Sequence, residues 1–124
     1  MRREDLERYL ERGERLGFQT GPDDDAYVGW ILVSKRQYDE RLLSLFPDRH
    51  DFKAEQEYAR VCPYQVWVAE LRRDVYERGE CEGAEVYRLS RSFYFPTLEH
   101  VEEFVRAYGH TLEGIKWARE IEST

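Results

Sequence analysis

Cysteine is scarce in this chain, and long apolar runs are missing. The 124 residues include two cysteines, Cys62 and Cys81, which do not form a CxxC motif. Two thiols alone make no metal site, and no apolar run approaches the ~18 residues of a membrane span. We expect Cys62 to be buried as a small apolar residue, and Cys81 to be unreactive because two glutamates flank it.

The sequence motifs of common catalytic sites are also absent. The chain has no glycine-rich phosphate loop, no HExxH and no GxSxG. Its first ten residues, MRREDLERYL, are charged and lack the apolar core of a signal peptide. We therefore expect a cytoplasmic protein with reduced cysteines, and we expect it to need no metal and no cofactor.

Charge is what the chain has in abundance. Charged residues make up 36% of the sequence, against about 25% in an average protein. The 26 acids outnumber the 19 bases, which gives a net charge of −7, and the excess acid lies at the two ends, in residues 1–25 and 96–124. Such a field repels nucleic acid and favours a basic protein partner.

The first third of the chain predicts a helix, a loop and a strand. Residues 4–16 place leucines and a tyrosine near helical spacing, with favourable i,i+4 ion pairs. The sequence GPDDD at 21–25 predicts a loop. Residues 26–33, AYVGWILV, predict a strand that is apolar on both faces and therefore covered on both.

Two short helices are expected next. Ser34 and Gln37 have the spacing of a capping box, which predicts a helix that ends before Pro47. Residues 52–60 predict a second short helix.

Residues 64–76 and 84–95 predict the two strands of a hairpin. A turn centred near residue 80 places the following pairs opposite each other: Trp67 with Phe93, and Leu71 with Leu89. A neighbouring register pairs Asp74 with Arg88 instead, and the sequence does not choose between the two.

The last third predicts a capped helix and a final element. Thr97 is placed to cap a helix over residues 98–108, and Gly109 stands where a helix-ending glycine belongs. Residues 115–121 favour a last strand, with a helix as the alternative.

This order predicts an α+β fold in one domain. The β-α-β-β-α-β succession over residues 26–121 is the ferredoxin-like arrangement, a four-stranded antiparallel sheet with helices on one face. Residues 1–17 add an extra N-terminal helix, and we expect this helix to cover the second face of the sheet. A second copy of the chain, or a different protein, is the alternative cover.

Three histidines are candidates for chemistry: His100 near Glu103, His110 in a turn, and His50 between Asp48 and Asp51. None is accompanied by a nucleophile or by a second ligating segment. A helix surface, a helix end and a solvated loop explain them more simply, and we do not expect an enzyme.

Arginines and tyrosines gather on the predicted hairpin and are candidates for binding an anion: Arg72, Arg73, Arg88, Arg91, Tyr87 and Tyr94. Acidic residues such as Glu70 and Asp74 interleave with them. The pattern favours a solvent face laced with salt bridges.

These observations favour a small, acidic, non-enzymatic interaction protein that binds and blocks a basic, nucleic-acid-handling protein. Its size and charge are similar to those of toxin-immunity proteins and phage-encoded inhibitors, some of which mimic nucleic acid. The expected partner contacts are Asp23, Asp24, Asp25, Glu99, Glu102 and Glu103. Aromatic richness, at 15%, favours the alternative of a dimeric regulatory module that binds a small molecule at a sheet edge or dimer cleft.

Overall fold

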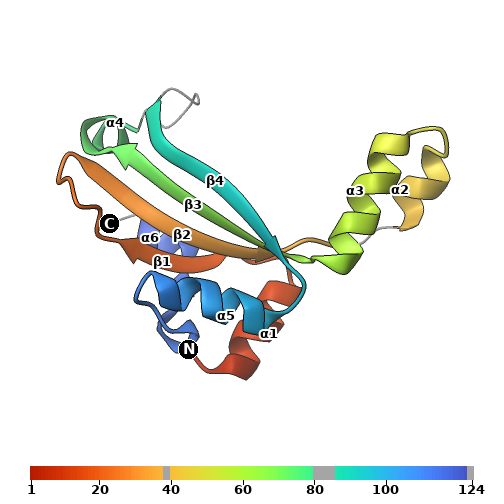
Figure 1. Cartoon of the computed structure of the whole chain (residues 1–124), viewed down its shortest axis with the longest axis horizontal. Coiled ribbons are helices and arrows are strands. Elements are labelled where there is room, and N and C mark those ends of the chain that lie inside the picture. The colour runs from red at the N-terminus through yellow and green to blue at the C-terminus, as the bar shows by residue number, and fades with distance from the viewer. Residues whose placement is uncertain (38–39, 80–85, 123–124) are drawn as a thin grey trace.

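One antiparallel sheet of five strands organises the chain (Figure 1). The computed structural model describes residues 1–37, 40–79 and 86–122. The strands lie in the order β4-β3-β2-β1-β5. Their bounds are β1 (Leu16–Thr20), β2 (Tyr27–Lys35), β3 (Tyr64–Arg72), β4 (Tyr87–Phe95) and β5 (Lys116–Trp117).

Helices connect and cover the strands. Their bounds are α1 (Arg3–Glu11), α2 (Glu40–Leu45), α3 (His50–Val61), α4 (Arg73–Glu77), α5 (Leu98–Ala107) and α6 (Ala118–Glu122), with a 3₁₀ turn, η2, at Leu112–Gly114. None of the helices in the described ranges combines the length and the apolar character that crossing a membrane requires. The α+β class expected from the sequence is confirmed.

The main core lies between one face of the sheet and the helices α1 and α5. Leu6 and Leu10 of α1 are buried in the same cluster as Val101 and Val105 of α5, against Ile31 of β2. The expectation that the N-terminal helix covers the second face of the sheet was therefore wrong. Its apolar stripe packs beside α5, which leaves the second face to other elements.

The second face is covered in part by the short helices α4 and α6. Val75 of α4 and Ile121 of α6 are buried with Trp30 of β2 and Leu71 of β3. Residues 28–33 of β2 are buried without a break, so the expected strand with two covered faces is confirmed.

A strand that the sequence analysis missed separates α1 from β2. The helix predicted over 4–16 ends at Glu11, because Gly13 takes a φ of +84° and turns the chain. β1 then pairs with β2, and Gly17 fits under Ile31, whose carbonyl oxygen would lie 2.2 Å from an added Cβ. A larger residue at position 17 would therefore force the backbone of β1 or β2 to shift.

The predicted capping box after β2 is wrong. Ser34 is still part of β2, where it pairs with Gln65. The side chain of Gln37 donates instead to the backbone oxygen of Glu11, at 3.2 Å. The helix predicted over residues 52–60 is confirmed. It is α3, which spans His50–Val61 and is longer than predicted at both ends.

The ferredoxin-like order is not confirmed. The sheet has five strands, and β2 and β3 are adjacent and antiparallel over their whole length. A crossover helix would have to join parallel strands. Here α2 and α3 form an excursion from the sheet, and Figure 1 shows them standing clear of its end. We call this helical pair, residues 40–61, the α2–α3 arm.

The predicted hairpin of β3 and β4 forms in a different register. Trp67 lies opposite Ser92 and Phe93 opposite Val66, one residue from the expected pairing. An irregularity between Glu70 and Leu71 shifts the register once more, and residues 73–77 form α4 instead of continuing the strand. The connection at 80–85 lies outside the described residues.

The ends of α5 follow the sequence closely. The Thr97 side chain accepts a hydrogen bond from the backbone N–H of His100, and Gly109 adopts a φ of +84°. Both predictions are confirmed. Residues 115–121 were predicted as a strand, with a helix as the alternative, and the structure contains both. β5 spans two residues and α6 follows at once.

Candidate functional site

Most of the large apolar side chains that are exposed in the described residues lie on the α2–α3 arm. Among the described residues, five large apolar side chains are exposed, and four of them belong to the arm: Leu45, Phe46, Tyr58 and Val61. Leu45 is 69% exposed and Val61 is 60% exposed. The fifth, Tyr108, follows α5. Apolar surface that gathers on one projecting element is typical of a binding site.

The base of the arm is held by Arg36, which follows β2. Its guanidinium carbon lies 5.0 Å from the ring centre of Tyr58 and 4.4 Å from that of Tyr94. Its Nη2 donates to the carbonyl oxygen of Cys62 at 2.8 Å, and its backbone N–H donates to Pro63 at 2.7 Å. These contacts join the end of α3 to the ends of β2 and β4. We call them the Arg36 clamp.

The acidic loop of residues 23–25 lies at the end of the sheet near α4. All three aspartates are exposed. Asp24 accepts a hydrogen bond from the backbone N–H of Ala26 at 2.9 Å, and Asp23 lies 3.4 Å from Arg88. The Asp23 side chain remains 95% exposed, so this acidic loop can still meet a partner.

The acids of α5 are more engaged. Glu102 accepts from Arg3 and from Arg106, each at 2.5 Å, and its side chain is only 19% exposed. Glu99 lies 3.3 Å from Arg3 but is 76% exposed. Glu103 is exposed. Glu102 therefore serves mainly to join α5 to α1, and Glu99 and Glu103 are more open to solvent than Glu102.

The two predicted groups of partner contacts lie apart. Figure 1 shows the β1–β2 loop at one tip of the sheet, and α5 along one of its faces. The structure does not bring the six acids into one patch.

The arginines of the hairpin are paired, as the sequence favoured. Arg88 donates to Glu70 at 2.5 Å and lies 4.0 Å above the Tyr27 ring. The hydrogen bond to Glu70 raises the pKa of the Arg88 guanidinium. Arg72 binds Asp74 with two hydrogen bonds, at 3.2 and 2.6 Å.

The rest of this group is also engaged. Arg73 donates to the backbone oxygen of Asp25 at 2.9 Å, and Arg91 lies above Phe93. Most of the positive charge on the hairpin is therefore used within the molecule.

Two of the three histidines lie in the first turns of helices, in the part of the chain described here. His100 Nδ1 contacts Thr97 Oγ1 at 2.6 Å, within the helix cap. His50 begins α3, where Asp51 pairs with Arg49. Within the described residues, no three metal-ligating side chains gather in one place.

Cys62 is partly buried and is a free thiol, so the expected burial is only partly met. Its carbonyl group, which receives Arg36, is its main structural contribution. Cys81 lies outside the described residues.

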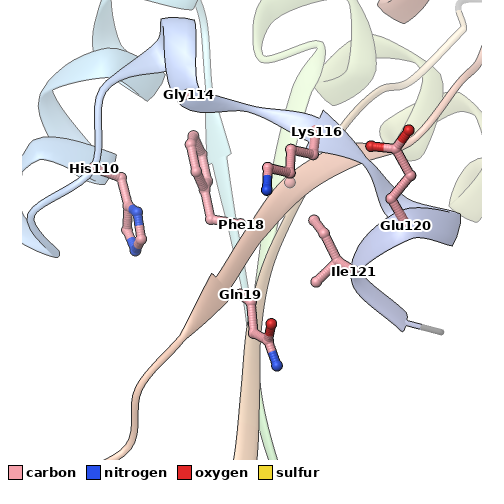
Figure 2. Close-up of a pocket in the computed structure, with 8 residues that line it drawn as sticks. Phe18, Gln19, His110, Gly114, Lys116, Glu120 and Ile121 are labelled. Atoms are coloured by element: carbon pink, nitrogen blue, oxygen red, sulfur yellow. The ribbon is translucent and has the colours of Figure 1, made fainter. Parts of the chain in front are cut away.

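A small cavity of about 300 Å³ lies where β1, β5 and α6 meet. Figure 2 shows it beside the Phe18 ring, which stacks on His110 with ring centres 4.7 Å apart. Its other lining side chains are those of Gln19, Lys116, Glu120 and Ile121.

The arm was not among the predicted sites, because an exposed apolar side chain and a buried one look alike in a sequence. Comparison of the whole chain with protein-family models, with curated proteins and with solved structures finds no match.

Proposed function

We propose that this protein is a non-enzymatic interaction module that binds a basic protein partner, and that the α2–α3 arm makes the apolar part of the contact. The observation that carries the proposal is the concentration of exposed Leu45, Phe46 and Val61 on one projecting element. Burying an exposed leucine is worth roughly 1.5–3 kcal/mol, so two or three such contacts supply a large part of a binding energy.

The Arg36 clamp supports this role because it fixes the arm before binding. Binding to a surface that is already ordered costs less conformational free energy than binding to a surface that must become ordered first. The clamp lies at the base of the arm, and Leu45 and Phe46 lie in α2 and just after it. Leu45 and Phe46 can thus be altered without touching the clamp, whereas Tyr58 is part of the clamp and Val61 precedes Cys62, whose carbonyl oxygen accepts from Arg36.

Charge supports a basic partner. The net charge is −7, and Asp23, Glu99 and Glu103 are exposed acids that remain open to solvent. Exposed charge of this kind speeds encounter and selects partners more than it adds affinity. A basic protein that handles nucleic acid is the partner class that fits this field, and occupying its basic surface would block it.

Affinity purification with three baits from the native host tests the proposal. The first is the wild-type protein and the second is Phe46→Ser. The third is Tyr108→Ser, a matched control because Tyr108 is 47% exposed and Phe46 is 45% exposed. We expect one basic protein in near-equal amount with the wild type and with Tyr108→Ser, and at least tenfold less of it with Phe46→Ser.

An acidic partner, or equal recovery with all three baits, contradicts the proposal. Melting temperatures of the three baits should agree within a few degrees, since both substituted side chains are exposed. A Phe46→Ser bait that melts much earlier would be replaced by Leu45→Ser.

A further inference from the structure

The two edges of the sheet are protected differently. At one edge, β5 spans two residues and the chain then turns into α6. At the other edge, β4 runs for nine residues, and its outer side pairs with no strand among the described residues. Figure 1 shows β4 along this edge of the sheet. A long open edge presents unpaired backbone groups to which another strand can bind.

β4 also lacks features that commonly keep an edge strand from pairing. The nearest proline comes only after the strand has ended, at residue 96. Of the two charged side chains on the strand, Arg88 is engaged by Glu70 at 2.5 Å. The other, Arg91, lies over the ring of Phe93 in its own strand. The strand has no acid, so a basic segment of another protein would bring like charges together there.

The regular part of β4 is Leu89–Phe95. Each of these residues lies opposite one residue of β3, whereas Arg88 has none opposite it because of the irregularity beside Glu70. When two copies of the regular segment pair antiparallel over their full length, the central residue, Ser92, lies opposite Ser92 of the second copy. The alignment therefore follows from the limits of the segment.

This alignment suits a second copy of the chain. It places Arg91 opposite Phe93 of the second copy, so that a cation faces an aromatic ring. It also places Leu89 opposite Phe95, so that apolar side chains meet on the same face of the sheet. Pairing over all nine residues of β4 would instead set Arg91 against Arg91 of the second copy.

We propose that β4 pairs with β4 of a second copy, antiparallel about a two-fold axis at Ser92, and joins the two sheets into one. The seven residues from each copy form a smaller contact than the roughly 20–30 residues a side of a standard interface. We therefore expect a weak dimer, with a dissociation constant of about 10–100 µM. The pairing does not use Leu45 or Phe46, so it goes beyond the interaction function and does not depend on it.

Sedimentation equilibrium of the full chain tests the proposal, because the two-fold axis makes residue 92 meet its own copy. The wild type should reach twice the 15.0 kDa mass of the chain at about 200 µM. Ser92→Glu and Ser92→Lys should each stay monomeric, since like charges then lie opposite each other. An equimolar mixture of the two variants should dimerise again, because a carboxylate then meets an ammonium group.

Two controls locate the contact. Ser90→Glu adds the same charge on the same face of β4, but opposite Tyr94 of the second copy, and should dimerise within about threefold of the wild type. Phe46→Ser should dimerise like the wild type, so loss of the basic partner and loss of the dimer are distinguishable. A wild type that stays monomeric at about 200 µM, a mixture of the charged variants that stays monomeric, or a dimer lost in Phe46→Ser would overturn the proposal.

Discussion

Replacing Arg36 with alanine should loosen the α2–α3 arm without unfolding the sheet. The substitution removes the cation–π contacts to the Tyr58 and Tyr94 rings, which also contact each other directly, and it removes the hydrogen bond to the Cys62 carbonyl. The two strands that begin and end the excursion keep their pairing, because β2 and β3 are paired through nine residue positions. The effect is therefore local.

The size of the effect follows from the contacts that are lost. Each cation–π contact is worth about 0.5–2 kcal/mol, and a hydrogen bond from a charged donor about 1.5–3 kcal/mol. Against this, Arg36 Nε is buried with no hydrogen-bond partner, and removing it recovers part of that cost. A net loss of about 2–4 kcal/mol remains, which corresponds to about a 30- to 1,000-fold change in the opening equilibrium.

Hydrogen exchange read out residue by residue is the assay, since it reports local opening separately from global unfolding. We expect amides of α3 to exchange at least 30-fold faster in Arg36→Ala, with amides of β2 unchanged. Arg60→Ala is the control, because Arg60 lies on α3, is 62% exposed and, within the described residues, has an ion pair with Glu57 alone. It should change exchange by about twofold. Exchange in Arg36→Ala that stays within twofold of the wild type would refute the clamp.

Four further predictions concern the rest of the molecule. Thr97→Ala removes the cap of α5 and should cost about 1 kcal/mol, seen as a melting temperature lower by about 4 °C. Desolvation alone would raise the pKa of the Asp74 carboxyl, but hydrogen bonds from Arg72 and the Val75 N–H lower it on balance. Wild type should therefore melt above Asp74→Asn at pH 7, and the gap should close as the pH falls below 3.8. Chelator should leave the melting temperature unchanged. Reversing residues 23–25 to lysine should slow association with a basic partner and flatten its salt dependence.

Each of these has an outcome that would count against it. An unchanged melting temperature in Thr97→Ala would show that the cap is replaced by water. A difference in melting temperature between wild type and Asp74→Asn that grows as the pH falls would show that ionised Asp74 does not stabilise the fold. A drop of more than ~5 °C with chelator would mean about 1 kcal/mol or more from a bound metal. Unchanged association after the charge reversal would remove the acidic loop from the interface.

Elements whose limits are set by local chemistry could be predicted from the sequence. The cap residue Thr97 and the glycine Gly109 define α5 from its own residues, and the apolar run of β2 is long enough to be unmistakable. β1 was missed because its five residues follow Gly13 closely and continue an apolar spacing that also fits a helix.

The arrangement of these elements depended on contacts that the sequence does not encode locally. The leucines of α1 indicate an apolar stripe, but β2 is apolar on both faces, so the stripe could not be assigned to one of them. The hairpin register depended on the irregularity after Glu70 and on α4. Both arise from packing across the sheet.

The candidate site shows the same limit. The acidic loop could be named from the sequence, because three adjacent aspartates have no place in a core. The arm could not, because an exposed leucine and a buried leucine look alike in a sequence. Only the arrangement in space reveals that Leu45 and Val61 lie outside the core.

The affinity of the purified partner for Phe46→Ser, compared with the wild type and with Tyr108→Ser, tests the central claim most directly. Truncating an apolar contact at the centre of an interface costs about 1–2 kcal/mol or more. We therefore expect the dissociation constant to rise at least tenfold for Phe46→Ser and to stay within twofold for Tyr108→Ser. Equal dissociation constants for all three proteins would show that the partner binds elsewhere and that the arm is not the interaction surface.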